Sequence, residues 1–266
     1  MSHSVRETRT ARSPWFTGTS PRAGVAFRLF CFPFAGGGAS VFRTWGARVG
    51  THIDICAMQP PGREERYHDA PFTDAVALAS AAATAMQPHL DVSYALFGHS
   101  MGALVAFEVA RALEALGAPP PRFLALSAYP APHLATTRRQ FHHLPTPALI
   151  EELKRLQGTP QAALDNPELM AFVLPTLRAD FAVCDTYAYR EARALALPLF
   201  VYGGQDDTDV SPSALDAWGA HTTGDVVRAT LPGGHFFLQT HRDQFLDQLA
   251  AAIATTAPPH RMGTTS

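Results

Sequence analysis

The sequence predicts an α/β fold with a mostly parallel central sheet, helices on both faces, and one inserted helical segment. Short apolar runs bounded by turn residues alternate with longer stretches of helical periodicity along most of the chain. Strands that alternate with helices usually pair in parallel, with the helices packed on both faces of the sheet. The 266 residues, 47% of them apolar, are compatible with one large domain or two small ones.

Six apolar runs are the predicted strands, and the segments between them carry the predicted helices. The strands are expected at Phe27–Phe32, Asp54–Met58, Tyr94–Phe97, Phe123–Ser127, Leu199–Gly203 and Val226–Leu231. The helices are expected at about Thr73–Leu90, Gly102–Leu116 and Gln244–Thr255, with a shorter one near Ser213–Ala220. This alternation is what favours a parallel sheet over an antiparallel one.

The segment from about residue 133 to 190 breaks the alternation, because it contains helical patterns and no strand signal. Thr146-Pro147 and Asn166-Pro167 each place a good N-cap before a proline at the first helical position. Two or three helices are therefore expected between one strand and the next. We interpret them as a lid over the carboxyl edge of the sheet, where open α/β sheets bind ligands. The alternative is a helical excursion packed beside the sheet.

The predicted domain covers residues 25–256. A Ser/Thr/Arg/Pro-rich leader, residues 1–24, and a tail, residues 257–266, are expected to be disordered. The leader has no apolar core of the kind that a secretory signal requires. A net charge of −2 gives no basic footprint for nucleic acid, and no apolar run approaches the length of a membrane span. These features predict a cytoplasmic protein.

Cysteine and histidine usage predicts no metal site. Cys31, Cys56 and Cys184 are odd in number, widely spaced and set among apolar residues. We interpret them as reduced thiols in the core rather than as disulfide partners or metal ligands. The pair His142-His143 lacks zinc-type spacing with a carboxylate.

Gly98-His99-Ser100-Met101-Gly102 matches the pattern G-x-S-x-G at a junction between a strand and a helix. A chance match in a chain of this length has a probability of about one in ten. The pattern therefore becomes informative only because a predicted strand precedes it and a predicted helix follows it. Glycines on both sides of the serine permit a turn too tight for side chains, which projects the hydroxyl above the sheet. The helix that begins there favours negative charge developing on a substrate oxygen. Ser100 is the predicted nucleophile.

A serine needs a base and an orienting acid, and in α/β-hydrolases these follow it in the order acid, then histidine. The stretch LPGGHFFL supplies His235 as the base, and GGQDDTDVSP supplies the acids after a predicted strand. Asp207 is the preferred acid because it fits the frame G-x-x-D-x-x-V, and Asp206 is the alternative. Asp209 is expected on the loop surface.

The sequence also predicts two backbone donors for an oxyanion. One is the N–H of Met101, directly after the serine, and the other is the N–H of Ala35, in the loop after the first strand. The glycines at 36–38 raise the possibility of phosphate binding. However, the stretch contains neither G-K-[ST] nor G-x-G-x-x-G, which excludes the common nucleotide motifs.

Five blocks of sequence together resemble one family. They are FPFAGGGASVFRTW, QPPGREER, ALFGHSMGALVAFEVARAL, LRADFAVCDTYAY and LPGGHFFL, and the resemblance covers the chain from about residue 27 to 250. In this order they resemble the stand-alone type II thioesterases of polyketide and nonribosomal peptide synthesis, which have the α/β-hydrolase fold. One departure is Phe34, where the family often has a histidine before the oxyanion alanine.

The resemblance implies hydrolysis of acyl thioesters on the phosphopantetheine arm of an acyl or peptidyl carrier protein, a transient partner. Such enzymes remove aberrant or stalled acyl groups through an acyl-serine, and the chemistry needs no cofactor. The acyl group would lie against Phe34, Phe236, Met170 and Phe181. A carrier could contact cations of the insertion, at Lys154, Arg155 or Arg178. The alternatives are a carboxylesterase or acyltransferase with the same triad, and a non-catalytic hydrolase-fold protein that only binds a ligand.

Overall fold

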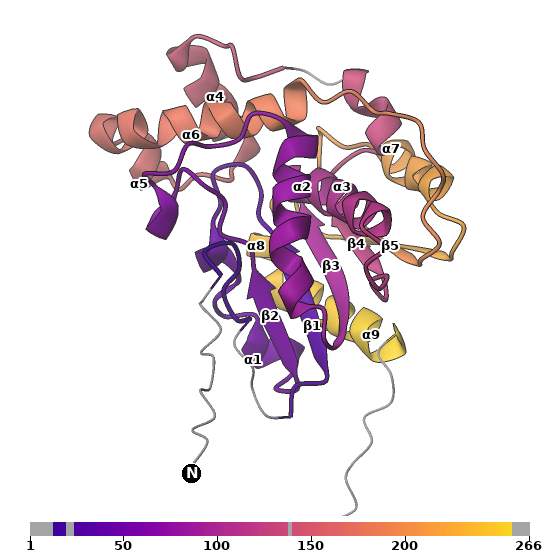
Figure 1. Ribbon diagram of the computed structural model, residues 1–266. Coiled ribbons are helices and arrows are strands. Elements are labelled where there is room, and N and C mark those ends of the chain that lie inside the picture. Colours follow the sequence, from indigo (N-terminus) through magenta and orange to yellow (C-terminus); the bar gives the residue numbers. More distant parts are fainter. Residues whose placement is uncertain (1–12, 20–23, 138–139, 257–266) are drawn as a thin grey trace, which may run out of the picture.

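The computed structural model describes residues 13–19, 24–137 and 140–256, and these contain one six-stranded sheet (Figure 1). Its five strand pairings are all parallel, in the order β2-β1-β3-β4-β5-β6. The strands are β1 (Phe27–Phe32), β2 (Ile53–Ala57), β3 (Ser93–His99), β4 (Leu124–Ser127), β5 (Leu199–Gly204) and β6 (Val226–Leu231). The predicted α/β class and its parallel sheet are confirmed.

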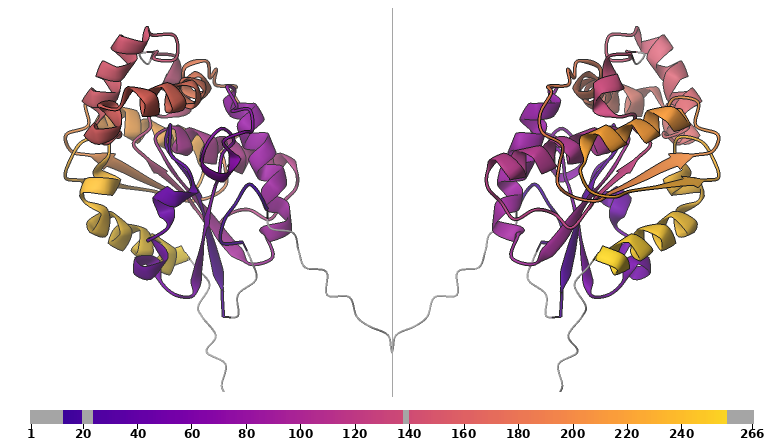
Figure 2. Two further views of the ribbon diagram at one scale, coloured as in Figure 1. Left: turned by 90° about the vertical axis from the view of Figure 1, so that its left-hand side faces the viewer. Right: turned by 90° about the vertical axis from the view of Figure 1, so that its right-hand side faces the viewer.

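The helices lie on both faces of this sheet and beyond one of its ends (Figure 1). They are α1 (Gly46–Val49), α2 (Ala75–Met86), α3 (Met101–Ala115), α4 (Thr146–Leu156), α5 (Gln161–Leu164), α6 (Pro167–Asp185), α7 (Pro212–Asp216), α8 (Phe237–Thr240) and α9 (Arg242–Thr256). Short 3-10 turns lie at Ala39–Phe42, Glu64–Arg66, Gln87–His89, Pro132–Thr137 and Ala217–His221. Helices α2 and α3 pack on one face, and α1 and α9 on the other (Figure 2). A separate apolar core fills the space on each side.

The strand β3 is longer than predicted, and its extension positions the predicted nucleophile. Gly98 and His99 carry no strand signal of their own, yet Gly98 pairs with Phe32 of β1 and His99 pairs with Ser127 of β4. Neighbours on both sides therefore impose the extended backbone. The strand order reverses between β1 and β3, and ligands of open α/β sheets bind at such a switch point.

The insertion forms a layer of helices α4, α5 and α6 beyond one end of the sheet (Figure 1). Asn166 caps α6 as predicted, since its side chain accepts a hydrogen bond from the N–H of Leu169 at 3.0 Å. The expected cap at Thr146 is wrong. Pro145 occupies the N-cap position, and the Thr146 hydroxyl instead accepts from Arg178 at 3.2 Å.

The N-terminal segment differs from the prediction over residues 13–19. Phe16 forms an antiparallel bridge with Met58 and is 2% exposed. The N–H of Thr17 donates to the carbonyl of Ala57 at 2.9 Å. Disorder of the whole leader is therefore the wrong expectation, because Phe16 buries its ring in the core. Residues 1–12 and 257–266 lie outside the described residues.

The three cysteines are free and buried, as expected of core thiols. Burial raises the pKa of the Cys56 thiol to about 12 and raises that of Cys31 well above its usual value. Over the described ranges, no helix combines the length and the apolar character that crossing a bilayer requires.

Candidate active site

Ser100 lies on a strained turn between β3 and α3, with φ 54° and ψ −123°. Few residues other than glycine adopt such a conformation, and it recurs where a side chain must be aimed. The serine occupies the N-cap position of α3, yet its hydroxyl makes no capping bond. The hydroxyl oxygen lies instead 2.9 Å from Nε2 of His235.

Two glycines make this turn possible. A Cβ atom on Gly98 would lie 1.9 Å from the carbonyl oxygen of Gly102, and a Cβ on Gly102 would lie 2.0 Å from the carbonyl oxygen of Phe32. Both clashes are with backbone, so no side-chain rotation can relieve them. The first turn of α3 therefore packs directly against the end of β1.

We expect Gly102→Ala to lower the free energy of unfolding by roughly 3 kcal/mol or more, because the backbone of β1 or α3 must move. Urea denaturation of the purified variant measures this loss. The matched control is Gly219→Ala, since a Cβ there meets no atom within 4 Å. The control should change the free energy of unfolding by less than about 0.5 kcal/mol. Equal stability of the two variants would contradict the close approach.

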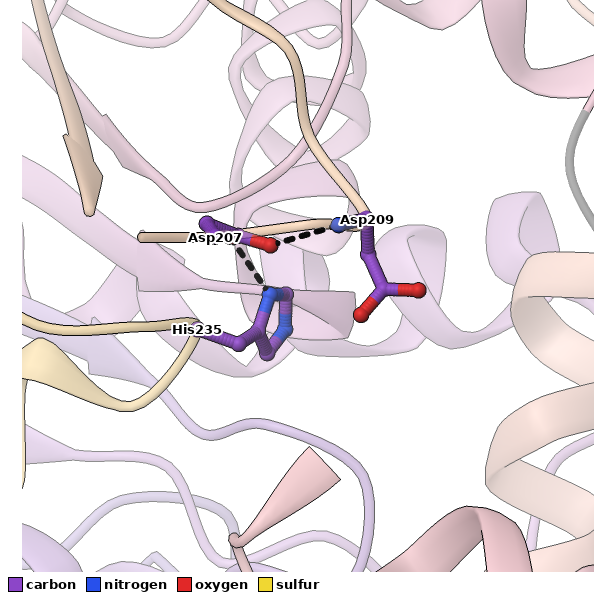
Figure 3. A group of neighbouring side chains, drawn as sticks. All are labelled: Asp207, Asp209 and His235. Atoms are coloured by element: carbon purple, nitrogen blue, oxygen red, sulfur yellow. Dashed lines mark hydrogen bonds and ion pairs between the residues drawn. The ribbon is translucent and has the colours of Figure 1, made fainter. Parts of the chain in front are cut away.

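The structure brings Ser100, His235 and Asp207 into one hydrogen-bonded chain. Nδ1 of His235 lies 2.8 Å from Oδ2 of Asp207 (Figure 3). Nε2 of the same ring faces the hydroxyl of Ser100. The side chains of His235 and Asp207 are 6% and 1% exposed. The backbone N–H groups of Asp209 and Val210 donate to Oδ1 of Asp207 at 2.8 and 3.2 Å. An acid held in this way orients the imidazole and stabilises its charged form.

Asp206, the alternative acid, is exposed, and within the described ranges its carboxylate has no hydrogen bond to His235. Its backbone N–H donates to the carbonyl of Gly233 at 2.9 Å, which places it on the turn after β5. The geometry therefore selects Asp207 as the partner of His235.

Asp209 lies on the loop surface, as expected, and its carboxylate is held by the insertion. Both of its oxygens accept from Arg155 of α4, at 2.8 and 2.9 Å. Asp207, Asp209 and His235 offer three possible metal ligands within 4.8 Å of one another (Figure 3). Each carboxylate is already engaged, one by His235 and backbone N–H groups and the other by a guanidinium. The arrangement is suited to orienting an imidazole rather than to coordinating an ion.

His99, beside the serine, is completely buried behind the triad. Its Nδ1 lies 2.8 Å from the hydroxyl oxygen of Ser127, and its ring centroid is 5.5 Å from that of His235. Burial lowers the pKa of His99 well below its usual value, and the neighbouring His235 lowers it further. His99 therefore stays neutral and adds no charge beside the base.

The two predicted oxyanion donors face the same space as the serine. Ala35, Met101, Ser100 and His235 line one hollow of about 30 Å³. Neither the N–H of Ala35 nor that of Met101 has a hydrogen-bond acceptor among the residues that the structure describes. Two unpaired N–H groups beside a nucleophile can stabilise an oxyanion.

A second hollow of about 40 Å³ adjoins Ser100, and the insertion covers it. Of the predicted acyl contacts, Phe34, Phe181 and Phe236 line this hollow, and the rings of Phe34 and Phe236 lie 4.9 Å apart. Met170 does not line it. It is 2% exposed and packs in the apolar core of the insertion. The cover also includes residues that the sequence analysis did not assign to the site. These are Leu156, Gly158, Thr159 and, in the neighbouring hollow, Phe141.

The lid interpretation follows from these contacts, because α4 supplies Leu156 and α6 supplies Phe181 over the serine. The contact with Leu156 carried no sequence signal. An amphipathic helix has the same pattern whether it covers a site or packs beside a sheet.

Comparison with known proteins identifies the family of this chain. The thioesterase domain family matches residues 27–253. The gramicidin S biosynthesis protein GrsT of Aneurinibacillus migulanus is 35% identical over 245 residues, which cover 92% of this chain and 96% of GrsT. RedJ, a thioesterase from the prodiginine biosynthetic pathway in Streptomyces coelicolor, superposes with a TM-score of 0.82 at 40% identity, covering 86% of each chain.

BorB, the type II thioesterase from the borrelidin biosynthetic cluster, superposes with a TM-score of 0.81 at 36% identity, covering 91% of this chain and 98% of BorB. The similarity to both solved structures confirms the expected α/β-hydrolase fold. The chain therefore belongs to the thioesterase family, among its type II members, and is an enzyme that hydrolyses thioesters.

Proposed function

We propose that the enzyme hydrolyses acyl thioesters carried on the phosphopantetheine arm of an acyl or peptidyl carrier protein. It would release aberrant or stalled acyl groups in polyketide or nonribosomal peptide synthesis, in the cytoplasm. The observation that carries the proposal is the Ser100–His235–Asp207 chain beside two unpaired backbone donors. The named pathways of RedJ and BorB support this setting.

The proposed reaction has two steps. His235 takes the proton of Ser100 through Nε2, and the serine oxygen attacks the thioester carbonyl carbon. The oxyanion lies between the N–H groups of Ala35 and Met101. The C–S bond breaks, the thiol leaves with the proton from His235, and an acyl-serine remains. His235 then activates a water that attacks the ester carbonyl, which releases the acid and restores the serine.

A larger hollow beside the site provides the proposed route for the arm. It measures about 320 Å³ and shares Phe34, Ala35, Gly158 and Thr159 with the small hollow at Ser100. A Cβ on Gly158 would lie 2.2 Å from the ring of Phe236, so the turn after α4 closes tightly on that ring. A space of about 40 Å³ is too small for an acyl chain. We infer that this turn shifts when substrate enters.

The cations of the insertion are already bonded within the chain. Lys154 pairs with Glu151 at 2.8 Å, Arg155 pairs with Asp209, and Arg178 donates to the carbonyl of His142 at 2.8 Å. An acidic carrier that contacts them has to compete with these partners. This competition is consistent with a short-lived complex.

The test of the proposed function compares two leaving groups on the same acyl chain. We expect an acyl group on a carrier arm to be released at least about tenfold faster, by kcat/KM, than the matching oxygen ester, a difference of about 1.4 kcal/mol in activation free energy. Mass spectrometry of the carrier follows the loss of the acyl group. Faster cleavage of the oxygen ester would favour a carboxylesterase, and transfer of the acyl group to an added alcohol or amine would favour an acyltransferase.

A serine-directed phosphonate separates these enzymes from a protein that only binds a ligand. We expect covalent labelling at Ser100, read by peptide mass. The control is the same reaction after Ser100→Ala, which should abolish the label. An unlabelled wild-type protein would contradict the proposed mechanism and revive the non-catalytic interpretation.

A further inference from the structure

Two of the sequence blocks, QPPGREER and LRADFAVCDTYAY, contribute no residue to the reaction steps above. The structure joins them through one buried ion pair, between Arg63 and Asp180, which are 8% and 2% exposed. Nη2 of Arg63 donates to Oδ1 of Asp180 at 2.7 Å, and Nη1 donates to Oδ2. A buried pair of this kind seldom adds much stability over apolar residues of similar size. The contacts of this pair therefore point to a role other than stability.

The pair holds the loop that carries Ala35. Oδ2 of Asp180 accepts the N–H of Gly36 at 2.7 Å, and Nη1 of Arg63 donates to the carbonyl of Gly37 at 3.2 Å. Gly36 has φ +81°, a left-handed conformation that glycine adopts far more readily than other residues. The ion pair thus holds the N–H of Gly36 and the carbonyl of Gly37, the two residues that follow the oxyanion donor Ala35.

A third contact fixes the direction of the Ala35 N–H. The N–H of Gly37 donates to the carbonyl of Phe34 at 2.9 Å. That carbonyl belongs to the same planar peptide group as the N–H of Ala35, and the two point in opposite directions. With the carbonyl held by Gly37, the N–H of Ala35 is turned away from the loop. Arg63 and Asp180 hold Gly36 and Gly37 in the position that this requires.

We propose that Arg63 and Asp180 are positioning residues that aim the Ala35 N–H at the oxyanion. The proposal rests on the proposed function, because it assumes that Ala35 donates in the reaction. Asp180 lies on α6, so the insertion also takes part in building the catalytic loop. Arg63 also lines the hollow of about 320 Å³, but the effect of the pair on the oxyanion passes through two glycine peptides.

The test replaces the pair without leaving a lone buried charge. In Arg63→Met/Asp180→Leu, apolar side chains fill the space and the N–H of Gly36 loses its acceptor. In Arg63→Met/Asp180→Asn, the amide oxygen can still accept that N–H. We expect kcat for the carrier thioester to fall about 10- to 100-fold in the first variant, with KM within about threefold of wild type. The second variant should recover most of kcat.

The control pair is Arg28→Met/Asp91→Asn. Arg28 is also a buried arginine, 3% exposed and paired with Asp91, but it lies at the other end of β1. This variant should keep the wild-type kcat. Melting temperatures of all three variants are recorded, as is the pH midpoint of kcat/KM. A purely structural role predicts a lower melting temperature with the same kcat in the folded fraction. An unchanged pH midpoint shows that the triad is intact.

Phosphonylation of Ser100 tests the positioning role without the natural substrate. During this reaction a negatively charged phosphoryl oxygen accepts hydrogen bonds from the same two N–H groups, those of Ala35 and Met101. We expect the second-order rate constant of phosphonylation to fall in Arg63→Met/Asp180→Leu by a factor similar to that for kcat, and to recover with Asn at 180. Equal rate constants in the wild type and the apolar pair would overturn the positioning role. So would an equal loss in both pair variants at native melting temperatures. A wild type that is phosphonylated but leaves the carrier thioester intact would overturn the proposed function alone.

Discussion

Ser100→Ala is expected to lower kcat for the carrier thioester by roughly 10⁴- to 10⁶-fold, while the protein stays folded. The substitution removes the atom that bonds to the acyl carbon, and His235 then has no hydroxyl within reach. The remaining rate comes from water attack helped by the backbone donors of Ala35 and Met101. Single-turnover release of the acyl group, followed by mass, measures the loss.

Residues of one triad act as a unit, so the losses of kcat in single and double variants of the triad should not add. His235→Ala alone should cost nearly as much as Ser100→Ala, and the double variant little more than either single one. The control is Ser213→Ala, at an exposed serine in the first turn of α7, which should leave kcat unchanged. Additive losses would mean that Ser100 and His235 act in separate steps.

Asp207→Asn is expected to lower kcat by about 10³- to 10⁴-fold. Oδ1 of Asp207 accepts two backbone N–H groups, from Asp209 and Val210. The asparagine oxygen must take that place, which turns the NH₂ group toward Nδ1 of His235. Nδ1 then has to accept, so the imidazole proton moves to Nε2. That nitrogen can no longer take the proton from Ser100.

The matched control for this substitution is Asp206→Asn, one residue earlier on the same loop. Asp206 is exposed and away from the imidazole, so its variant should keep kcat within about twofold of wild type. Steady-state kinetics of both variants on one carrier thioester make the comparison. A larger loss of kcat from Asp206→Asn than from Asp207→Asn would show that Asp206, and not Asp207, is the triad acid.

The fold was predictable because its signals are local. Each strand is a short apolar run, and Asn166 before Pro167 marks the start of α6 by side-chain chemistry alone. The turn at Ser100 could be predicted from the G-x-S-x-G pattern for the same reason. A side chain at Gly98 or Gly102 would clash with backbone of the same turn or of the neighbouring strand. The order of acid and base along the chain then indicated where to look for partners.

The features of the fold and the site that could not be predicted depend on contacts between residues far apart in the sequence. Phe16 lies in a polar stretch, and only its packing against β1 and β2 shows that this segment belongs to the core. Met170 and Phe181 are both apolar residues of α6, yet one faces the interior of the insertion and the other faces the serine. Arg63 and Asp180 are 117 residues apart, and neither sequence block indicates the other.

The contact between Arg155 and Asp209 has a consequence for protein engineering. Asp209 uses its backbone N–H to hold the triad acid and its carboxylate to hold α4. A chimaera that imports the insertion of a relative, in order to change the accepted chain length, will therefore disturb the acid loop unless position 155 still carries an arginine. Grafts of this segment should be designed as matched pairs with the loop after β5, so that the cover and the triad are exchanged as one module.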